Sequence, residues 1–333
     1  MARPVIIRPF SHAIRMLAAA VLAASFAAPS YAQANWPNRP IKLVVPFAAG
    51  GNTDSVARLA LPHLQKALPG ASVVIENRGG AGGIVGTDLV AKAAPDGYTV
   101  CVCSIGAITI SPWIEKLPYD PFKDLEPVSL LSANALVLAV HPSVEANSVK
   151  DIIALAKAKP KAFAYGSSGA GGLTHIAALL FQARTGTQLT HAAYRGGAPA
   201  MAALTSGEVK LIFGNISDVL PQLEAKKARA LAVTTSERSP YLPDVPTMME
   251  AGVPDYNVRL WNAWFVPKGT PKPVIDTLAK VAAEIAADPQ VRKSMAVFGT
   301  EPQANSPAAF AAMLQKETKD WGELLTAAGV ARK

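Results

Sequence analysis

The chain has 333 residues, of which 32 are lysine or arginine and 24 are aspartate or glutamate, giving a formal net charge of +8. The basic residues are scattered and are not interleaved with aromatic residues, which argues against a nucleic-acid-binding protein. A modest positive charge would instead attract anionic ligands. The histidines and cysteines lack the spacing of a zinc site, and we expect neither a metal nor a cofactor.

The N-terminal segment, residues 1–32, has the pattern of a secretory signal peptide. Three arginines precede the apolar run Met16–Ala28, and small residues end the segment at Ala32, after which we predict cleavage; Ala34 is the alternative site. The apolar run is shorter than the ~20 residues that a membrane-spanning helix needs. No cysteine near the cleavage site could carry a lipid. We therefore expect an exported chain that resides in the periplasm.

Removal of residues 1–32 leaves 333 − 32 = 301 residues, which suggests about two domains at ~150 residues per domain. Strand-like and helix-like segments alternate through this region, which predicts an α/β fold with mostly parallel sheets and helices on both faces. The predicted strands are Ile41–Val45, Ser72–Ile75, Tyr98–Cys103, Phe163–Tyr165, Leu189–His191, Leu211–Phe213 and Ala230–Thr234. The predicted helices are Thr53–Leu68, Gly83–Lys92, Val149–Lys157, Leu173–Thr185, Ala198–Thr205, Val219–Glu224, Pro273–Ala286, Gln290–Val297 and Pro307–Ala327.

Two long apolar stretches, Pro127–Val140 and Tyr256–Val266, break this alternation. Each is long enough to be a strand that crosses from one domain to the other, and two crossings make the first domain discontinuous. We predict a first domain of residues 35–132 plus 258–333 and a second domain of residues 133–257.

A glycine loop, Pro46–Asn52, follows the first predicted strand and leads into a helix that opens near Asn52 or Thr53. The first turn of a helix has backbone N–H groups without internal partners, and glycine lets the backbone close around a small anion. The segment is either a carboxylate-binding loop, with the Thr53 hydroxyl as a further donor, or an ordinary loop in which Asn52 or Thr53 caps the helix. This loop alone leaves both interpretations open.

A second glycine loop, Tyr165–His175, repeats the order of strand, loop and helix and adds two serines. It is not a dinucleotide-binding loop, because Thr174 stands where the third glycine is needed, and it lacks the lysine of a P-loop. A nucleophile elbow would need glycine in place of Ala170, so a hydrolase based on Ser168 and His175 is the weaker alternative. Two anion-holding helix starts suggest a clamp for a small carboxylate.

Three further segments hold candidate cleft residues. The glycine-rich turn Glu76–Gly86 could line a cleft or pack a helix tightly on the sheet. Arg195, in Tyr194–Gly197, could pair with a carboxylate or lie at the surface. Asp54 and Asp218 could hold a hydroxyl, an amine or a water molecule, or could each favour the start of its own helix.

The two cysteines, Cys101 and Cys103, lie two residues apart in a predicted strand, so their side chains share one face. A spacing of ~6.6 Å is at the far edge of disulfide reach. We expect buried free thiols that act as small core residues.

Six segments, in this order, closely resemble the Bug-type solute-binding proteins of tripartite tricarboxylate transporters, over nearly the whole mature chain. They are WPNRPIKLVVPFAAGGNTDSVAR, VIENRGGAGGIVG with APDGYT downstream, YGSSGAGGLTHIAALLF, AYRGGAPA, DVPTMMEAG and WNAWFVPKGTP. One departure is Gly79, where the family usually has proline.

The resemblance implies a two-domain periplasmic-binding-protein (Venus-flytrap) fold, each domain a mostly parallel sheet flanked by helices, that closes on a small carboxylate without a reaction or a cofactor. The ligand would be a di- or tricarboxylate, an aromatic acid or an acidic amino acid. The implied partners are the permease subunits of a tripartite transporter, with a sensor kinase as the alternative, and we expect a monomer. The implied ligand-binding residues are Phe47, Ala48, Gly50, Gly51, Thr53, Asp54, Ser167, Ser168, Gly171, Gly172, His175, Tyr194, Arg195 and Asp218.

Overall fold

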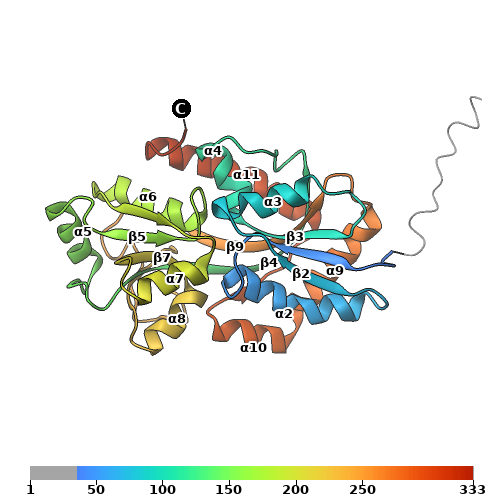
Figure 1. The fold of residues 1–333 in the computed structure, drawn as a ribbon, viewed down its shortest axis with the longest axis horizontal. Coiled ribbons are helices and arrows are strands. Elements are labelled where there is room, and N and C mark those ends of the chain that lie inside the picture. Colours follow the sequence, from blue (N-terminus) through green and yellow to red (C-terminus); the bar gives the residue numbers. More distant parts are fainter. Residues whose placement is uncertain (1–35, 333) are drawn as a thin grey trace, which may run out of the picture. The chain divides into compact units, whose positions relative to one another are not determined.

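A computed structural model describes residues 36–332 of the chain, so the predicted signal peptide and its cleavage site lie outside the described residues. Residues Arg39–Lys333 form one compact unit. A ten-stranded sheet runs through this unit, and helices cover both of its faces (Figure 1). No helix in the described range is long and apolar enough to cross a membrane.

The strand order of the sheet is β2-β1-β3-β9-β4-β7-β5-β6, and β8 and β10 pair with β4 as well. We call β2, β1, β3, β9 and the beginning of β4 the first half of the sheet, and the end of β4 with β7, β5, β6 and β8 the second half. The strands are β1 Ile41–Val45, β2 Val73–Asn77, β3 Thr99–Ser104, β4 Leu125–Val140, β5 Ala164–Ser167, β6 Thr190–Ala193, β7 Leu211–Asn215, β8 Arg229–Val233, β9 Arg259–Pro267 and β10 Glu301–Pro302.

Each half of the sheet has a parallel core, as the alternation of strands and helices predicts. In the first half β1 pairs in parallel with β2 and β3, and in the second half β5 pairs in parallel with β6 and β7. The antiparallel pairs all involve β4 or β9. The fold is therefore α/β, with two mostly parallel groups of strands joined through long connecting strands.

The α-helices follow the predicted positions closely, and two of them, α6 and α11, have the predicted bounds. They are α2 Asn52–Ala67, α3 Ile84–Ala91, α4 Ser111–Ile114, α5 Val149–Ala158, α6 Leu173–Thr185, α7 Gly197–Thr205, α8 Ile216–Glu224, α9 Lys272–Ala287, α10 Pro289–Val297 and α11 Pro307–Ala327. The sequence did not predict α4, the π-helical turn η3 (Gly106–Ile110), the 3-10 turn η2 (Ala81–Gly83) or β10. These elements have two to five residues, too few for a hydrophobic period to register.

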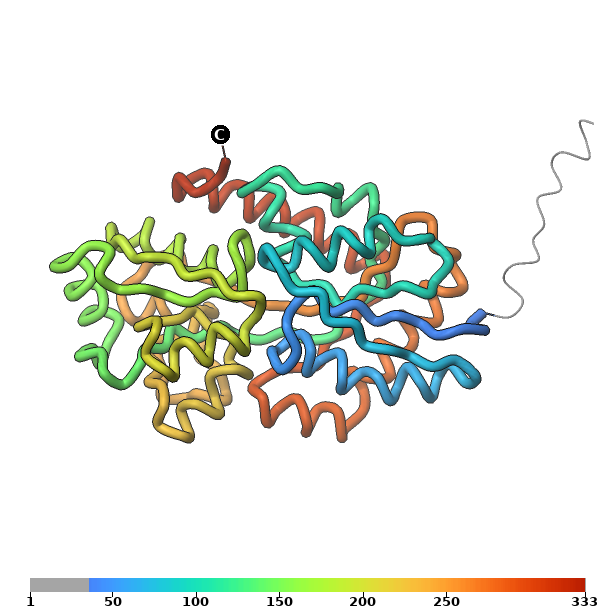
Figure 2. The backbone as a smooth tube through the Cα atoms, in the orientation of Figure 1, coloured from blue at the N-terminus to red at the C-terminus, as the bar shows by residue number. Residues whose placement is uncertain are grey.

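Strand β4 connects the two halves of the sheet, and its path can be followed in Figure 2. Its beginning, from Leu125 to Ala135, pairs with β9, and its end, from Leu136 to Val140, pairs with β7. The strand is buried on both faces: Leu136 and Leu138 belong to one hydrophobic cluster, and Val137 to the other. This explains why its sequence is a continuous apolar run without alternation.

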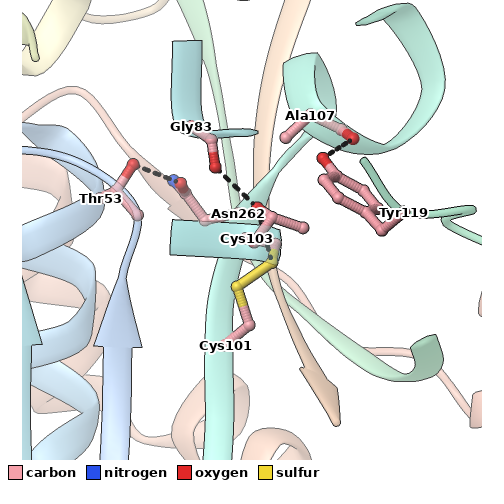
Figure 3. The surroundings of a disulfide bond; sticks show 8 residues. Thr53, Gly83, Cys101, Cys103, Ala107, Tyr119 and Asn262 are labelled. Carbon is pink, nitrogen blue, oxygen red and sulfur yellow. Dashed lines mark hydrogen bonds between the residues drawn. A yellow bond between two sulfur atoms is a disulfide. The ribbon is translucent and has the colours of Figure 1, made fainter. Parts of the chain in front are cut away.

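Cys101 and Cys103 form a disulfide within β3 (Figure 3). The prediction of free thiols is therefore wrong. It assumed a fully extended strand, whereas the two Cα atoms lie 5.3 Å apart, within the usual range for disulfides. Both cysteines are fully buried. The hydroxyl of Thr87 lies 3.6 Å from Sγ of Cys103 and donates to the carbonyl of Gly83.

Candidate functional site

Three loops meet beside the middle of the sheet. They are Pro46–Gly51 between β1 and α2, Ser168–Gly172 between β5 and α6, and Tyr194–Gly196 between β6 and α7. All three follow the carboxyl ends of parallel strands, where α/β proteins bind ligands. A cavity of about 20 Å³ lies among them, and we call it the cleft. It is lined by Phe47, Gly51, Asn52, Thr53, Ser104, Ser168, Leu173, Thr174, Gly197, Asn215 and Leu260.

A cavity of this size holds about one water molecule. A larger groove of about 690 Å³ lies between α2 and α9, lined by His63, Lys66 and Glu284 among others. None of the three loops contributes to the lining of that groove. We therefore take the cleft, and not this larger groove, as the candidate site.

The helices that start at the cleft begin without a side-chain cap. The N-cap residues of α2, α6 and α7 are Gly51, Gly172 and Gly196, none of which has a side chain that could cap its helix. From the neighbouring helix α8, the carboxylate of Asp218 accepts the backbone N–H of Asn52, the first residue of α2. Helix α2 starts at Asn52, within the expected range, but its N-cap residue is Gly51, which excludes Asn52 and Thr53 as the N-cap, one of the two interpretations left open. First-turn residues of all three helices line one small space, and the positive ends of the helix dipoles favour an anion there.

Glycines let the loops approach each other backbone to backbone. A Cβ atom on Gly169 would collide with the backbone of Gly82, and one on Gly82 would collide with the backbone of Gly172. The glycine-rich turn Glu76–Gly86, for which the sequence left two interpretations open, thus packs against the second glycine loop. Gly79, where the family usually has proline, lies against the carbonyl of Arg195.

Asp54 holds the first glycine loop together. Its carboxylate accepts hydrogen bonds from the backbone N–H of Gly50 at 2.9 Å, from Nε of Arg58 at 2.8 Å and from Nδ2 of Asn77 at 3.0 Å. Burial alone would raise the pKa of Asp54, but the hydrogen bonds from Arg58, Gly50 and Asn77 outweigh it and lower this pKa. Both carboxylate oxygens have partners, so in this geometry Asp54 shapes the loop and does not face the cleft.

A buried polar network connects the start of α2 to the middle of the sheet. The hydroxyl of Thr53 donates to Oδ1 of Asn262 in β9 at 2.9 Å (Figure 3). Nδ2 of Asn262 donates to Oδ1 of Asn52 at 2.7 Å and to Oγ of Ser132 in β4 at 3.1 Å. Nδ2 of Asn52 in turn donates to Oγ of Ser217 in α8 at 2.9 Å. The chain of bonds thus runs from the two long strands through α2 to α8, the helix that follows β7.

Sequence reasoning missed the role of Asn262, which is fully buried. The available signal was a lone amide inside the apolar run Tyr256–Val266, since a buried polar side chain needs a partner. Nothing in the sequence, however, identifies that partner as Asn52 or Thr53, about 210 residues earlier in the chain.

The second glycine loop is held by its own hydroxyl and imidazole groups. The backbone N–H of Ser168 donates to Oγ1 of Thr174 at 2.9 Å, and the two hydroxyls lie 2.9 Å apart. Nδ1 of His175 accepts the N–H of Gly171 at 3.1 Å. Ser168 therefore pairs with Thr174 and not with His175, which removes the geometric basis of a hydrolase that uses Ser168 and His175.

The serine–histidine hydrogen bond in this loop joins Ser167 to His191. Oγ of Ser167 lies 2.7 Å from Nε2 of His191 and accepts the N–H of Gly169 at 3.2 Å. The rings of His175 and His191 stack with centroids 4.0 Å apart. Burial and the neighbouring His191 lower the pKa of His175 to about 4, and burial lowers the pKa of His191. Both rings are neutral at pH 7 and act as hydrogen-bond partners of the loop.

Tyr194, Arg195 and Asp218 were also predicted to bind the ligand, but they are not among the residues that line the cleft. Tyr194 donates its hydroxyl to Glu208 at 2.8 Å, and Arg195 is exposed while its carbonyl accepts the N–H of Ala48 at 2.9 Å. Neither side chain lines the cleft. Asp218, at the start of α8, accepts a hydrogen bond from Nδ2 of Asn215 at 3.1 Å. The assignment of these residues to ligand binding stays a prediction.

Parallel strands in two groups, long connecting strands and three helix starts at one cleft define a two-domain binding protein of the periplasmic type. A family model described as "Tripartite tricarboxylate transporter family receptor" matches residues 56–330, and the chain belongs to this family. Its members are solute-binding receptors and not enzymes, and they are periplasmic.

The chain is 35% identical to the protein BugT of Bordetella pertussis over 94% of this chain and 96% of BugT. Its structure is similar to that of the periplasmic binding protein BugD, with a TM-score of 0.85, 35% identity and coverage of 90% of this chain and 100% of BugD. It is also similar to the structure of R. palustris Rpa4515 with adipate, with a TM-score of 0.85 and 35% identity over 89% of this chain and 99% of Rpa4515. The structure of MatC from Rhodopseudomonas palustris with bound malate is similar with a TM-score of 0.83 and 32% identity, over 87% of this chain and 100% of MatC.

Proposed function

We propose that this chain captures a small organic carboxylate in the cleft and delivers it to the membrane permease of a tripartite tricarboxylate-type transporter. Two structural relatives support the ligand class, since one is described with adipate and the other with malate. Family membership supports the transporter partner. The predicted signal peptide, residues 1–32, supports export to the periplasm, where such a receptor works.

The observation that carries the proposal is the convergence of uncapped helix starts. First-turn residues of α2, α6 and α7 line the same cleft, with glycine at each N-cap position. A carboxylate placed there would accept several N–H bonds at once and lie at the positive ends of three helix dipoles. These interactions are strong in a cleft from which most of the water is excluded.

Contacts between segments that follow strands of the first half and of the second half of the sheet suggest how binding would be coupled to closure. Ala48 donates its N–H to the carbonyl of Arg195 at 2.9 Å, and Ser111 donates its hydroxyl to the carbonyl of Gly171 at 3.2 Å. A dicarboxylate is larger than the cleft of about 20 Å³, so these contacts must separate for it to enter. A ligand that bridges both sides would favour the closed form through contacts that the open form lacks.

The domain division is part of the same proposal. Residues 35–132 plus 258–333 would make one domain and residues 133–257 the other, with the hinge in β4 and before β9. The change of partners along β4, from β9 to β7 after Ala135, supports a boundary in this region. The proposed ligand contacts come from the glycine loops of both domains.

A thermal-shift screen of the chain without residues 1–32 against mono-, di-, tri- and aromatic carboxylates tests the proposal. A ligand at about a hundredfold excess over its Kd adds ~2.7 kcal/mol of stability. We expect a clear upward shift of the melting temperature for one class of acid and none for the matching amides, which lack the charge. A folded protein whose melting temperature no carboxylate raises would contradict the proposal.

A further inference from the structure

One wall of the cleft carries a hydrogen-bond acceptor without a partner. Asn215, at the junction of β7 and α8, lines the cleft and is 9% exposed. Its Nδ2 donates to Asp218, but its Oδ1 is buried and has no partner among the described residues. A buried carbonyl left without a donor costs free energy, so such a group in a binding cleft indicates a donor on the ligand.

The orientation of the Asn215 amide follows from its neighbour. Turning the amide over would place Oδ1 against the carboxylate of Asp218, so that two acceptors would face each other at about the present 3.1 Å. Burial raises the pKa of Asp218 to about 6, so at pH 7.5 this carboxylate is ionised and needs the donor. The nitrogen of Asn215 is therefore committed to Asp218, and the carbonyl oxygen remains for the cleft.

The charge of Asp218 further restricts what can lie on this side of the cleft. An ionised carboxylate repels a second anionic group placed close to it. Asp218 itself accepts the N–H of Asn52 at the start of α2, and its Oδ2 lies against Gly197 at the start of α7. The anionic end of a ligand is therefore expected at the start of α6. The group that lies near Asn215 must be neutral or positive and must carry a proton to donate.

Building on the carboxylate-binding function proposed above, we propose that Asn215 selects ligands with a hydroxyl or ammonium group on the carbon next to the carboxylate. Asn215 lines the same small cavity as Ser168, Leu173 and Thr174, at the start of α6. A carboxylate at this helix start therefore brings its adjacent carbon within reach of the acceptor. Hydroxy acids and amino acids share this donor, and plain dicarboxylates lack it.

Two matched sets of acids test the inference by calorimetric titration at pH 7.5. Succinate, malate and aspartate share four carbons, and glutarate, 2-hydroxyglutarate and glutamate share five; within each set only the donor differs. We expect at least one hydroxy or amino acid to bind about tenfold or more tightly than the plain acid of its set. Within each set, comparing the hydroxy acid with the amino acid shows whether the preferred donor is a hydroxyl or an ammonium group.

The variant Asn215→Leu removes the acceptor with little change in side-chain volume. The ratio of affinities within a set should then fall to within about twofold of one, whatever the overall loss of affinity, because damage common to both ligands cancels in the ratio. Asn134→Leu is the matched control. Asn134 is also a buried asparagine whose Oδ1 has no partner, but it lines a different groove, so the ratio should not change.

Each other outcome contradicts the inference. Equal affinities within a set for the wild-type protein would overturn it and leave the carboxylate receptor in place, and this result does not depend on whether the variant folds. A ratio that persists in Asn215→Leu would assign the selectivity to another residue. Binding of other carboxylates but of none of these six acids would overturn the inference alone, whereas failure of every carboxylate would overturn the proposed function as well.

Discussion

Helices that begin at the cleft and helices that begin elsewhere start in different ways. Ser148, Asp288 and Ser306 accept hydrogen bonds from the first N–H groups of α5, α10 and α11. At α2, α6 and α7, glycine occupies the same position. A side-chain cap contributes about 0.5–2 kcal/mol, so the N-cap glycines give up this stabilisation. Asp218 accepts the N–H of Asn52, and we propose that a ligand uses others of these N–H groups.

The comparison also shows what an uncapped helix does not mean. Helix α9 starts after Pro271, and no described side chain caps it either, although it has no part in the cleft. A missing cap is therefore not in itself a sign of a ligand site. What distinguishes the cleft is that three such starts converge on one space.

The largest expected effect comes from closing the space between the loops. Gly169 has φ of +141°, and an added Cβ would collide with the backbone of Gly82. We expect Gly169→Ala to lower carboxylate affinity at least about a hundredfold, since the loops could no longer meet. Gly186→Ala is the control: Gly186 has φ of +65° in open space, so this variant should lose about 1 kcal/mol of stability and keep its affinity. Equal affinities of the two variants, measured by titration, would contradict the role of the loop contact.

A second prediction concerns the network that holds the uncapped start of α2. Replacing Asn262 by alanine leaves Asn52, Thr53 and Ser132 without their buried partner. We expect a loss of about 2–3 kcal/mol in the free energy of unfolding, measured with urea, together with weaker ligand binding. Thr277→Ala, which removes an exposed hydroxyl on α9, should change neither quantity by more than about 0.5 kcal/mol. Unaltered stability of Asn262→Ala would show that the network is dispensable.

A third pair of variants separates stability from binding directly. Ser168→Ala removes a hydroxyl that lines the cleft and should weaken carboxylate binding by about 1–2 kcal/mol. Ser306→Ala removes the cap of α11 and should lower the free energy of unfolding by about 1 kcal/mol without changing affinity. Titration gives the carboxylate affinity of each variant, and urea denaturation gives its free energy of unfolding. An affinity change in Ser306→Ala as large as in Ser168→Ala would remove the distinction between the two kinds of helix start.

The smallest effect is a pH dependence that arises on the capped helix α11. Glu317 accepts hydrogen bonds from Nε1 of Trp261 at 2.9 Å and from the hydroxyl of Thr109 at 3.2 Å, and burial raises its pKa to about 7. Because this pKa is raised on folding, the stabilisation is complete below pH 4.5 and is lost as the pH rises through 7. Between pH 5 and pH 8 the wild-type protein should therefore lose on the order of 1 kcal/mol relative to Glu317→Gln. Parallel stability curves for the two proteins over this range would contradict the assignment.

The sequence by itself determined the order of strands and helices and the position of the glycine loops. Hydrophobic periods and glycine positions are local properties, so β1, α6 and α11 have their predicted bounds. The resemblance also led to the correct family. Short elements such as η3 and α4 were not predicted, because four or five residues are too few for a hydrophobic period to be recognised.

Only the tertiary structure decided which side chains meet. Asn262 and Thr53 are 209 residues apart in the chain, and no local pattern pairs them. The same holds for Ser168, whose partner proved to be Thr174, and for Asn215, whose free carbonyl becomes visible only once Asp218 is placed beside its nitrogen. The disulfide of Cys101 depended on the local shape of β3, which an ideal strand does not describe. Partners in space depend on the packing of the whole chain, and a one-dimensional pattern records only the residues that need them.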